Sequence, residues 1–159
     1  MSEASHQRFM REAIELSKIN IREGRGGPFA ALIVKDGTVL ARGTNLVTST
    51  NDPTAHAEIV AIREACQALG SFQLEGCDMY TSCEPCPMCL GAIYWARPRA
   101  VYYANTRDDA AEIGFDDRFI YDEFPRTHEL RRIPMTQLLR DEALVAFHEW
   151  MKKADKVSY

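Results

Sequence analysis

Strand-like and helical patterns alternate along most of this chain, and this alternation restricts the folds open to it. Residues 29–45 hold two apolar runs on either side of Asp36-Gly37, a pair typical of β-hairpin turns. Two further strand-like segments, 78–82 and 99–105, each follow a segment with helical character. Helices are predicted at 5–23, 56–70, 87–96 and 137–154, and residues 106–134 are predicted to be irregular.

This order of elements predicts the fold class. Strands that alternate with helices indicate one sheet with helices on both of its faces. Because the first two strands form a hairpin, we expect a mixed sheet, in which the strand–helix–strand connections are right-handed. We therefore predict an α/β fold: a single three-layer α/β/α domain over residues 1–159, with a mixed central sheet of about five strands.

Composition narrows the setting in which the chain works. It has 159 residues, of which 46% are hydrophobic and 26% charged, as in ordinary soluble globular proteins. No apolar run approaches the roughly 20 residues that a membrane span needs, so we expect no membrane partner. Residues 1–16 are polar and charged, unlike a signal peptide, and we expect a cytoplasmic protein. Its five cysteines would then be reduced, which favours metal ligands or catalytic groups over disulfides.

The charge balance bears on the partner. The formal net charge is −4 and the sequence pI is about 5.6. Proteins that hold nucleic acid usually carry a basic patch, because phosphate contacts supply much of their affinity. The densest basic cluster here is Arg131-Arg132, with Arg126 nearby. We therefore expect a small-molecule substrate and no nucleic-acid partner.

Two clusters with metal-binding chemistry stand at the starts of two predicted helices. One is His56-Ala57-Glu58, and the other contains Cys86 and Cys89, which lie one turn apart after Pro85. The positive end of a helix favours the thiolate form that a metal needs. One imidazole and two thiolates form a suitable ligand set for zinc.

The number of ligands decides between a structural and a catalytic metal site. Structural zinc sites use four protein ligands, whereas catalytic ones use three and keep a position for water. Cys83 is an alternative fourth ligand, but it precedes the helix and ends a strand, so we expect it to be unligated. A redox pair is a further alternative, although it would leave His56 and Glu58 without a role. Cys66 and Cys77 are expected to be buried apolar thiols.

Glu58 gives the open metal position a purpose. Zinc lowers the pKa of a bound water to near neutrality, and we expect a water or hydroxide as the fourth ligand of a single zinc ion. A neighbouring carboxylate can take the proton of that water and deliver it to the substrate. H-x-E followed by P-C-x-x-C is the pattern of zinc-dependent nucleobase deaminases. The sequence therefore predicts hydrolytic deamination.

Four segments extend the likeness beyond the metal motif. GGPFAALIVKDG, NDPTAHAE, TSCEPCPMCLGAIYWARP and GFDDRFIYDE resemble the bacterial guanine deaminases of the cytidine deaminase superfamily, and the likeness covers nearly the whole chain. The resemblance implies a cytidine-deaminase-like fold and the conversion of guanine to xanthine, as in purine catabolism. It implies these site residues: zinc ligands His56, Cys86 and Cys89; catalytic Glu58 and Asp117; and substrate contacts from Phe29, Asn45, the backbone of Ala57, Trp95 and Asp117.

The resemblance also concerns the end of the chain. It implies that the tail, about residues 154–159, covers an active site, with Tyr159 closing it. Members of this family form homodimers that exchange C-terminal segments, so the covered site is expected to be that of the partner.

Several substrates remain open at this point. Guanosine or an aminotriazine would undergo the same chemistry, and a tRNA adenosine deaminase would carry the same zinc motif. A zinc-stabilised binding module without turnover is an alternative from another class. A Glu58→Ala substitution distinguishes it, because such a module would keep its properties without Glu58.

Overall fold

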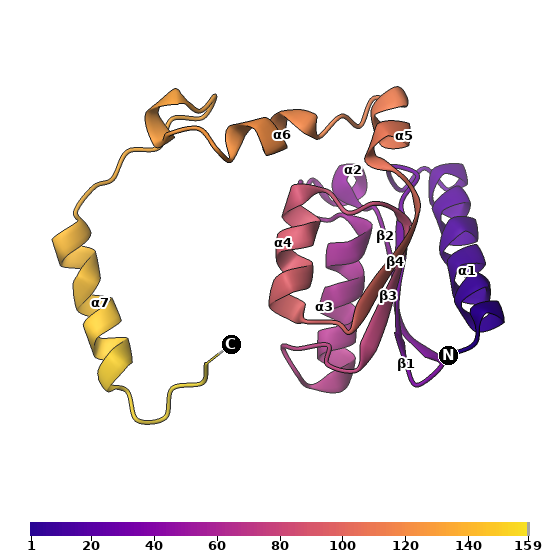
Figure 1. Cartoon of the computed structure of the whole chain (residues 1–159), viewed down its shortest axis with the longest axis horizontal. Coiled ribbons are helices and arrows are strands. Elements are labelled where there is room, and N and C mark those ends of the chain that lie inside the picture. Colours follow the sequence, from indigo (N-terminus) through magenta and orange to yellow (C-terminus); the bar gives the residue numbers. More distant parts are fainter. Residues whose placement is uncertain (159) are drawn as a thin grey trace. The chain divides into compact units, whose positions relative to one another are not determined.

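Helices cover both faces of a central sheet in the computed structural model, which describes residues 1–158 (Figure 1). Tyr159, predicted to contact substrate, lies outside the described residues. The longer elements of the sheet and its layers are α1 (Glu3–Arg22), β1 (Ala30–Lys35), β2 (Thr38–Thr44), α3 (Ala57–Leu69), β3 (Cys77–Cys83), α4 (Pro87–Ala96) and β4 (Ala100–Asn105). Two short helices, α2 (Val47–Thr50) and α5 (Arg107–Glu112), lie in the connections.

The chain divides into two compact units. The first, Met1–Asp117, holds the sheet with its helices, and the second begins at Arg118. The second unit contains α6 (Arg118–Glu123), a 3₁₀ turn η1 (His128–Leu130) and α7 (Arg140–Lys152). Within the described chain, no helix has both the length and the apolar character needed to cross a membrane.

The sheet is mixed, as predicted. Its strand order is β2-β1-β3-β4, with β1 antiparallel to both β2 and β3, and β3 parallel to β4. The described sheet has four strands rather than about five. The β1–β2 turn has positive φ at both Asp36 (48°) and Gly37 (76°), which is the backbone that the Asp-Gly pair favours.

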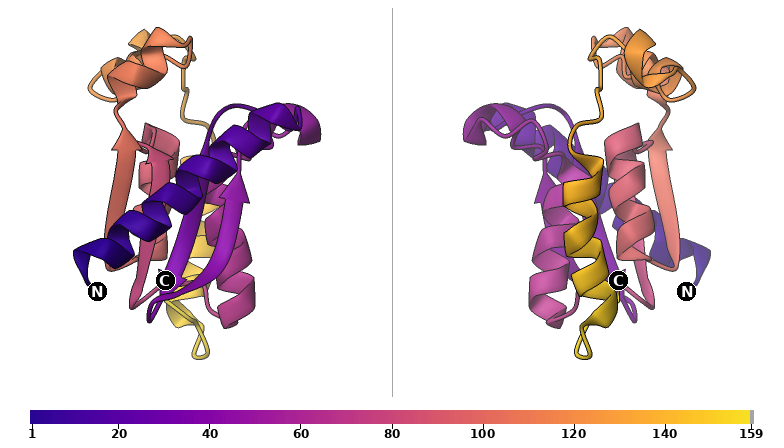
Figure 2. Two further views of the ribbon diagram at one scale, coloured as in Figure 1. Left: turned by 90° about the vertical axis from the view of Figure 1, so that its right-hand side faces the viewer. Right: turned by 90° about the vertical axis from the view of Figure 1, so that its left-hand side faces the viewer.

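Side chains of β1 alternate between two buried layers. Ala31 and Ile33 join the core against α3 and α4, whereas Leu32 and Val34 join the core against α1. Figure 2 shows α1 on one side of the sheet, with α3 and α4 together on the other. The three-layer α/β/α prediction is therefore confirmed for the first unit.

Aromatic contacts hold α1 on its face of the sheet. Phe9 packs against Tyr80 of β3 with ring centroids 5.3 Å apart, and Tyr80 stacks on Tyr102 of β4 at 4.9 Å. The Tyr80 hydroxyl lies 2.7 Å from Nδ1 of His6. Burial is the main reason that the pKa of Tyr80 rises to about 12, so its hydroxyl keeps its proton. These contacts fix the position of α1 against β3 and β4.

Residues 106–134 contain short helices where the sequence predicted irregular structure. The start of α5 is a capping box: the Thr106 hydroxyl accepts from the Asp109 backbone N–H at 3.2 Å, and the Asp109 carboxylate accepts from the Thr106 N–H at 2.7 Å. The T-x-x-D spacing was a local signal for this helix.

Gly43 allows α3 to lie close to β2. A Cβ atom at this position would collide with the backbone oxygen of Ala57 and lie 2.5 Å from the backbone nitrogen of Ala61. Both of these atoms belong to the first turns of α3. The position of the α3 N-terminus therefore depends on the missing side chain.

Gly43→Ala is expected to lower the free energy of unfolding by about 1–3 kcal/mol, because the added methyl group must displace α3. Chemical denaturation measures this change. Gly91→Ala is the control, since a Cβ there meets nothing within 4 Å, and it should leave stability equal or slightly higher. Equal stability of the two variants would contradict the close approach.

Candidate functional site

The candidate site lies where two helices begin. His56 is the N-cap residue of α3, and Cys86 is the N-cap residue of α4, both with extended backbone. Neither side chain makes the usual capping hydrogen bond to its own helix. They turn toward each other instead, with Nδ1 of His56 3.5 Å from Sγ of Cys86.

A third ligand comes from the first turn of α4. Sγ of Cys89 lies 3.5 Å from the same His56 nitrogen, and the three donor atoms all lie within 4.8 Å of one another. In tetrahedral zinc sites, sulfur and nitrogen ligands lie about 3.6 Å apart, given the usual bond lengths. The spacing and the ligand types therefore fit zinc, and no fourth His, Cys, Asp or Glu joins this group among the described residues.

The two ligand sulfurs differ in protonation. The hydrogen bond from Cys89 lowers the pKa of Cys86 to about 4, with a further contribution from His56. The same sharing with Cys86, together with burial, raises the pKa of Cys89. Both sulfurs would have to lose their protons to bind a metal ion.

Glu58 faces this cluster from the first turn of α3. Its side chain is buried, with 6% exposure, and Oε2 accepts from the Cys89 thiol at 3.5 Å. Burial raises the pKa of Glu58. A buried carboxyl group with a raised pKa beside the metal ligands suits the predicted general acid–base role.

Cys83 stands apart from the metal-binding group. It is the last residue of β3, and its thiol contacts the Thr106 carbonyl oxygen at 3.6 Å. Burial raises its pKa to about 11, so it remains a thiol. Its environment agrees with the prediction that it is the cysteine left unligated.

Sheet topology brings the predicted substrate residues to the same edge as the metal ligands. Phe29 precedes β1 and Asn45 follows β2, whose ends pair through Ala30 and Thr44. The start of β1 also pairs with the end of β3, with Ala31 opposite Thr81. The chain leaving β3 then leads to Cys86.

Asn45 is oriented by the backbone around it. Its Oδ1 accepts from the N–H groups of Gly27 and Val47, both at 3.3 Å. No described residue accepts a hydrogen bond from its Nδ2. An amide can both donate and accept, but the oxygen of Asn45 is already used here, so its NH₂ group is the one available to a ligand.

An aromatic pair stands beside this amide. Phe29 and Phe115 meet edge to face, with ring centroids 4.9 Å apart. A Cβ at Gly27 would lie 3.1 Å from the Phe29 ring and 3.2 Å from the Phe115 ring, so the glycine lets the loop pass close to both. Phe115 was not among the predicted substrate contacts.

Asp117 interacts electrostatically with two of the metal ligands, His56 and Cys86. Burial, followed by the charge of Cys86, raises the pKa of Asp117. Asp117 in turn contributes to the raised pKa of His56, whose main cause is the hydrogen bond with Cys86.

The N–H of Ala57, in the first turn of α3, lacks an acceptor within the helix and can bind a ligand.

Trp95 is the one described substrate prediction that lies away from this group. It is the penultimate residue of α4, about 9 Å along the helix axis from Cys89, and 63% exposed. Its proposed contact with substrate stays a prediction.

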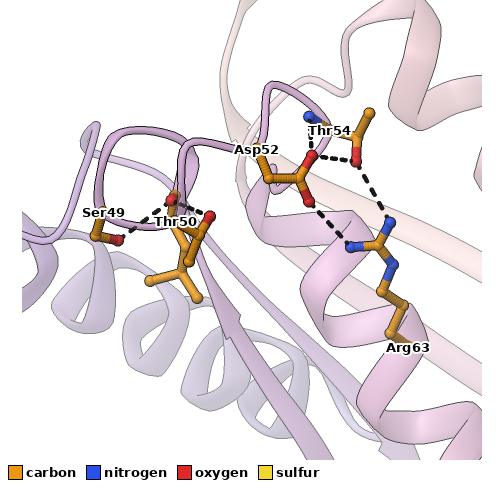
Figure 3. Close-up of polar contacts among 6 residues, drawn as sticks. Ser49, Thr50, Asp52, Thr54 and Arg63 are labelled. Atoms are coloured by element: carbon orange, nitrogen blue, oxygen red, sulfur yellow. Dashed lines mark hydrogen bonds and ion pairs between the residues drawn. The ribbon is translucent and has the colours of Figure 1, made fainter.

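A polar network stabilises the loop that precedes His56 (Figure 3). Oδ1 of Asp52 accepts from the backbone N–H and the hydroxyl of Thr54, at 2.8 and 2.7 Å. Arg63 of α3 contacts Asp52 at 3.6 Å and donates to the Thr54 hydroxyl at 3.3 Å. The His56 N–H then donates to the Thr54 carbonyl at 2.8 Å. Arg63 thus ties the loop to the helix that His56 begins.

Comparison with known proteins agrees with this arrangement. Residues 3–105 match the family model of the cytidine and deoxycytidylate deaminase zinc-binding region. The chain belongs to this deaminase family. The predicted fold and the predicted zinc-binding, deaminase-type site are thereby confirmed at the level of the family.

Two relatives align with different lengths of this chain. The chain is 55% identical to the guanine deaminase of Bacillus subtilis (strain 168) over 98% of its own length and 99% of the relative. A tRNA-specific adenosine deaminase of Agrobacterium fabrum is 53% identical, but over 55% of this chain and 59% of the relative. The first alignment, over 98% of the chain, includes most of the second unit.

Solved structures are similar to the deaminase over most of its length. The X-ray structure of the Bacillus subtilis guanine deaminase has a TM-score of 0.95 and covers 100% of this chain and 99% of that one, at 53% identity. A variant protein solved in complex with 8-azaguanine has a TM-score of 0.68 at 37% identity, covering 91% of this chain and 83% of that one.

Arg63→Ala in the deaminase is expected to raise the rate of zinc loss to a chelator about tenfold, because the loop before His56 loses its tie to α3. A colorimetric chelator measures this rate. Glu64→Ala, an exposed neighbour on the same helix, is the control and should not change it. A rate equal to that of the parent would show that the network does not support the metal ligand.

Proposed function

We propose that the deaminase hydrolyses guanine at C2 to xanthine and ammonia, with one zinc ion per chain. The observation that carries the proposal is the meeting of His56, Cys86 and Cys89 beside the buried Glu58. The choice of guanine is supported by the 55% identity to a guanine deaminase over both units of the chain.

The three-ligand set leaves room for a reacting water. His56, Cys86 and Cys89 would hold a zinc ion that keeps a fourth position, and the ion would there make a water molecule acidic enough to supply hydroxide near neutral pH. The buried surroundings of Glu58 and Cys89 limit the access of other water to this position. Two thiolates would also balance the charge of the ion.

Glu58 is assigned the proton transfers. In the net reaction water supplies the oxygen at C2, and the 2-amino group leaves as ammonia. A proton must therefore move from the water to a ring nitrogen, and a further one to the departing amino group. Glu58 lies in the first turn of α3 with a raised pKa, so it can accept and release these protons in turn.

The remaining groups are assigned to guanine recognition. Asn45 would donate from Nδ2 to an acceptor of the base, such as O6, N3 or N7, because its oxygen is bound to the backbone. The N–H of Ala57 would donate to the ring edge, and the ring of Phe29 would pack against the base. Asp117 would accept from the 2-amino group and assist its departure.

The net charge of the chain argues against a tRNA substrate. A polyanionic anticodon loop requires a basic surface, whereas this chain has a net charge of −4. Guanosine and aminotriazines share the amino-substituted edge of guanine and remain competitors for the same site.

The assembly of the protein is inferred from the resemblance stated above. We infer a cytoplasmic homodimer that acts in purine breakdown, in which segment 154–159, with Tyr159, covers the partner's site. Trp95 would contact substrate or the covering segment. The exposed apolar side chains Val145, Phe147 and Trp150 of α7 are consistent with a helix that packs against another surface.

An ammonia-release assay on zinc-loaded protein tests the substrate. Guanine, guanosine, adenine, cytosine, an aminotriazine and tRNA are compared at equal concentrations, with guanine expected to give the highest kcat/KM. Faster ammonia release from guanosine or an aminotriazine would change the assigned substrate but leave the proposed hydrolytic deamination unchanged. No release from any of them would favour a binding module without turnover.

Glu58→Gln is expected to lower kcat by about 10²–10⁴-fold while the zinc content stays at one per chain. The amide keeps the size of the side chain but cannot carry the proton. Single-turnover kinetics and metal analysis of the same preparation measure both quantities. A kcat within twofold of the parent would remove Glu58 from the chemistry.

Deletion of residues 154–159 is expected to raise KM for guanine without releasing zinc, because the proposed cover is lost while the metal ligands remain. Mixing this variant with a Glu58→Gln chain provides a control for exchange between copies. In swapped heterodimers, an active Glu58 site regains a full tail from its partner, so activity should increase on mixing. Unchanged kinetics of the truncated protein would refute the cover.

A further inference from the structure

Asn20 lies on α1, outside the metal centre, yet its side chain reaches the loops that carry the substrate residues. It is 1% exposed and belongs to the last turns of the helix. Its Nδ2 donates to the carbonyl oxygen of Gly27 and to that of Asn45, both at 2.9 Å. One buried amide therefore connects α1, the loop before β1 and the end of β2.

These two carbonyls belong to the residues that orient the substrate groups. The Gly27 N–H donates to Oδ1 of Asn45, and the Gly27 carbonyl also accepts from the Phe29 N–H at 2.8 Å. The Asn45 N–H donates to the Phe29 carbonyl at 3.0 Å. Asn20 thus holds the backbone on both sides of the Gly27–Asn45 side-chain bond.

The chain passes so closely here that little adjustment is possible. A Cβ at Gly26 would collide with the Asn45 carbonyl oxygen and lie 2.7 Å from its Oδ1. With Gly26 against the Asn45 backbone, a change in the separation of the two loops would alter the Asn45 rotamer directly. The donors of Asn20 set that separation.

The carbonyl half of the Asn20 amide is a destabilising feature of this arrangement. Oδ1 of Asn20 is buried and has no hydrogen-bond partner, which is unfavourable for a polar atom. An apolar side chain of similar size would avoid this penalty. The two donated bonds are therefore the feature that distinguishes Asn20 from a leucine at the same place.

We propose that Asn20 is a positioning residue for substrate recognition: it holds the Asn45 carboxamide with its oxygen on the Gly27 N–H and its NH₂ group toward the base. This inference rests on the proposed function for the identity of the base. Among the described residues, the side chain of Asn20 donates to the loops of Gly27 and Asn45 and makes no hydrogen bond to α3 or α4, so its role is separate from that of the metal ligands.

A double-mutant cycle tests the link between the two asparagines. Asn20→Leu and Asn20→Ser each remove the paired donors, and kcat/KM for guanine is expected to fall about tenfold, mainly through KM, because an ordinary binding interaction is weakened. In the Asn45→Ala background the same substitutions should change kcat/KM less than twofold. Equal losses in both backgrounds would show that Asn20 acts on stability alone and would overturn the proposal.

Ser17→Ala is the matched control for these variants. Ser17 is also buried on α1, and its hydroxyl donates to the Ile14 carbonyl of the same helix at 2.8 Å. Its removal should leave kcat/KM unchanged. Zinc content should equal one per chain in every variant, which separates a change in recognition from a loss of the metal centre.

Amide hydrogen exchange provides a readout that does not depend on guanine. The Gly27 N–H should be protected in the parent and exchange faster in Asn45→Ala, which removes its acceptor. Asn20→Leu and Asn20→Ser should accelerate the same amide, while Ser17→Ala should not. Unchanged Gly27 protection in both Asn20 variants would overturn the positioning role. If the parent fails to deaminate guanine, the proposed function falls, and the exchange data still decide the role of Asn20.

Discussion

The contact between the starts of α3 and α4 is the interaction on which the candidate site depends. His56 and Cys86 occupy N-cap positions without capping their helices, and each turns its donor atom to the other. This requires two helices on the same face of the sheet, with α3 close to β2 over Gly43. The fold therefore supplies the ligand geometry through helix placement.

Much of the fold was predictable because its determinants are local. Asp36-Gly37 specifies the hairpin turn, and apolar runs buried on both faces, such as β1, identify central strands. The count of about five strands and the irregular structure after β4 were less accurate. The capping box of Thr106 and Asp109 starts a helix there, and a short polar segment offers no hydrophobic periodicity from which to predict it.

The residues of the candidate site also differ in whether local sequence could predict them. The spacing of Cys86 and Cys89, one helical turn apart, and the neighbouring residues His56 and Glu58 indicated the metal centre. Asn45 and Phe29 were identified through resemblance, because a loop asparagine carries no signal of its own. Asn20 had none either: its partners lie 7 and 25 residues away and are backbone carbonyls, which every residue possesses.

The sheet separates the groups assigned to chemistry from those assigned to recognition. His56, Glu58 and the two cysteines belong to the starts of α3 and α4, on one face. Asn45 and Phe29 lie at the ends of β2 and β1, and their loops are tied by Asn20 to α1, which packs on the opposite face. The two sets meet at the edge where β1 begins and β3 ends, and also where the N–H of Leu46, next to Asn45, donates to the carbonyl of Ala55, next to His56, at 2.9 Å. Because distant, unshared contacts contribute nearly independently, substitutions on the α1 side can alter the choice of base while the metal centre and its proton transfers stay intact.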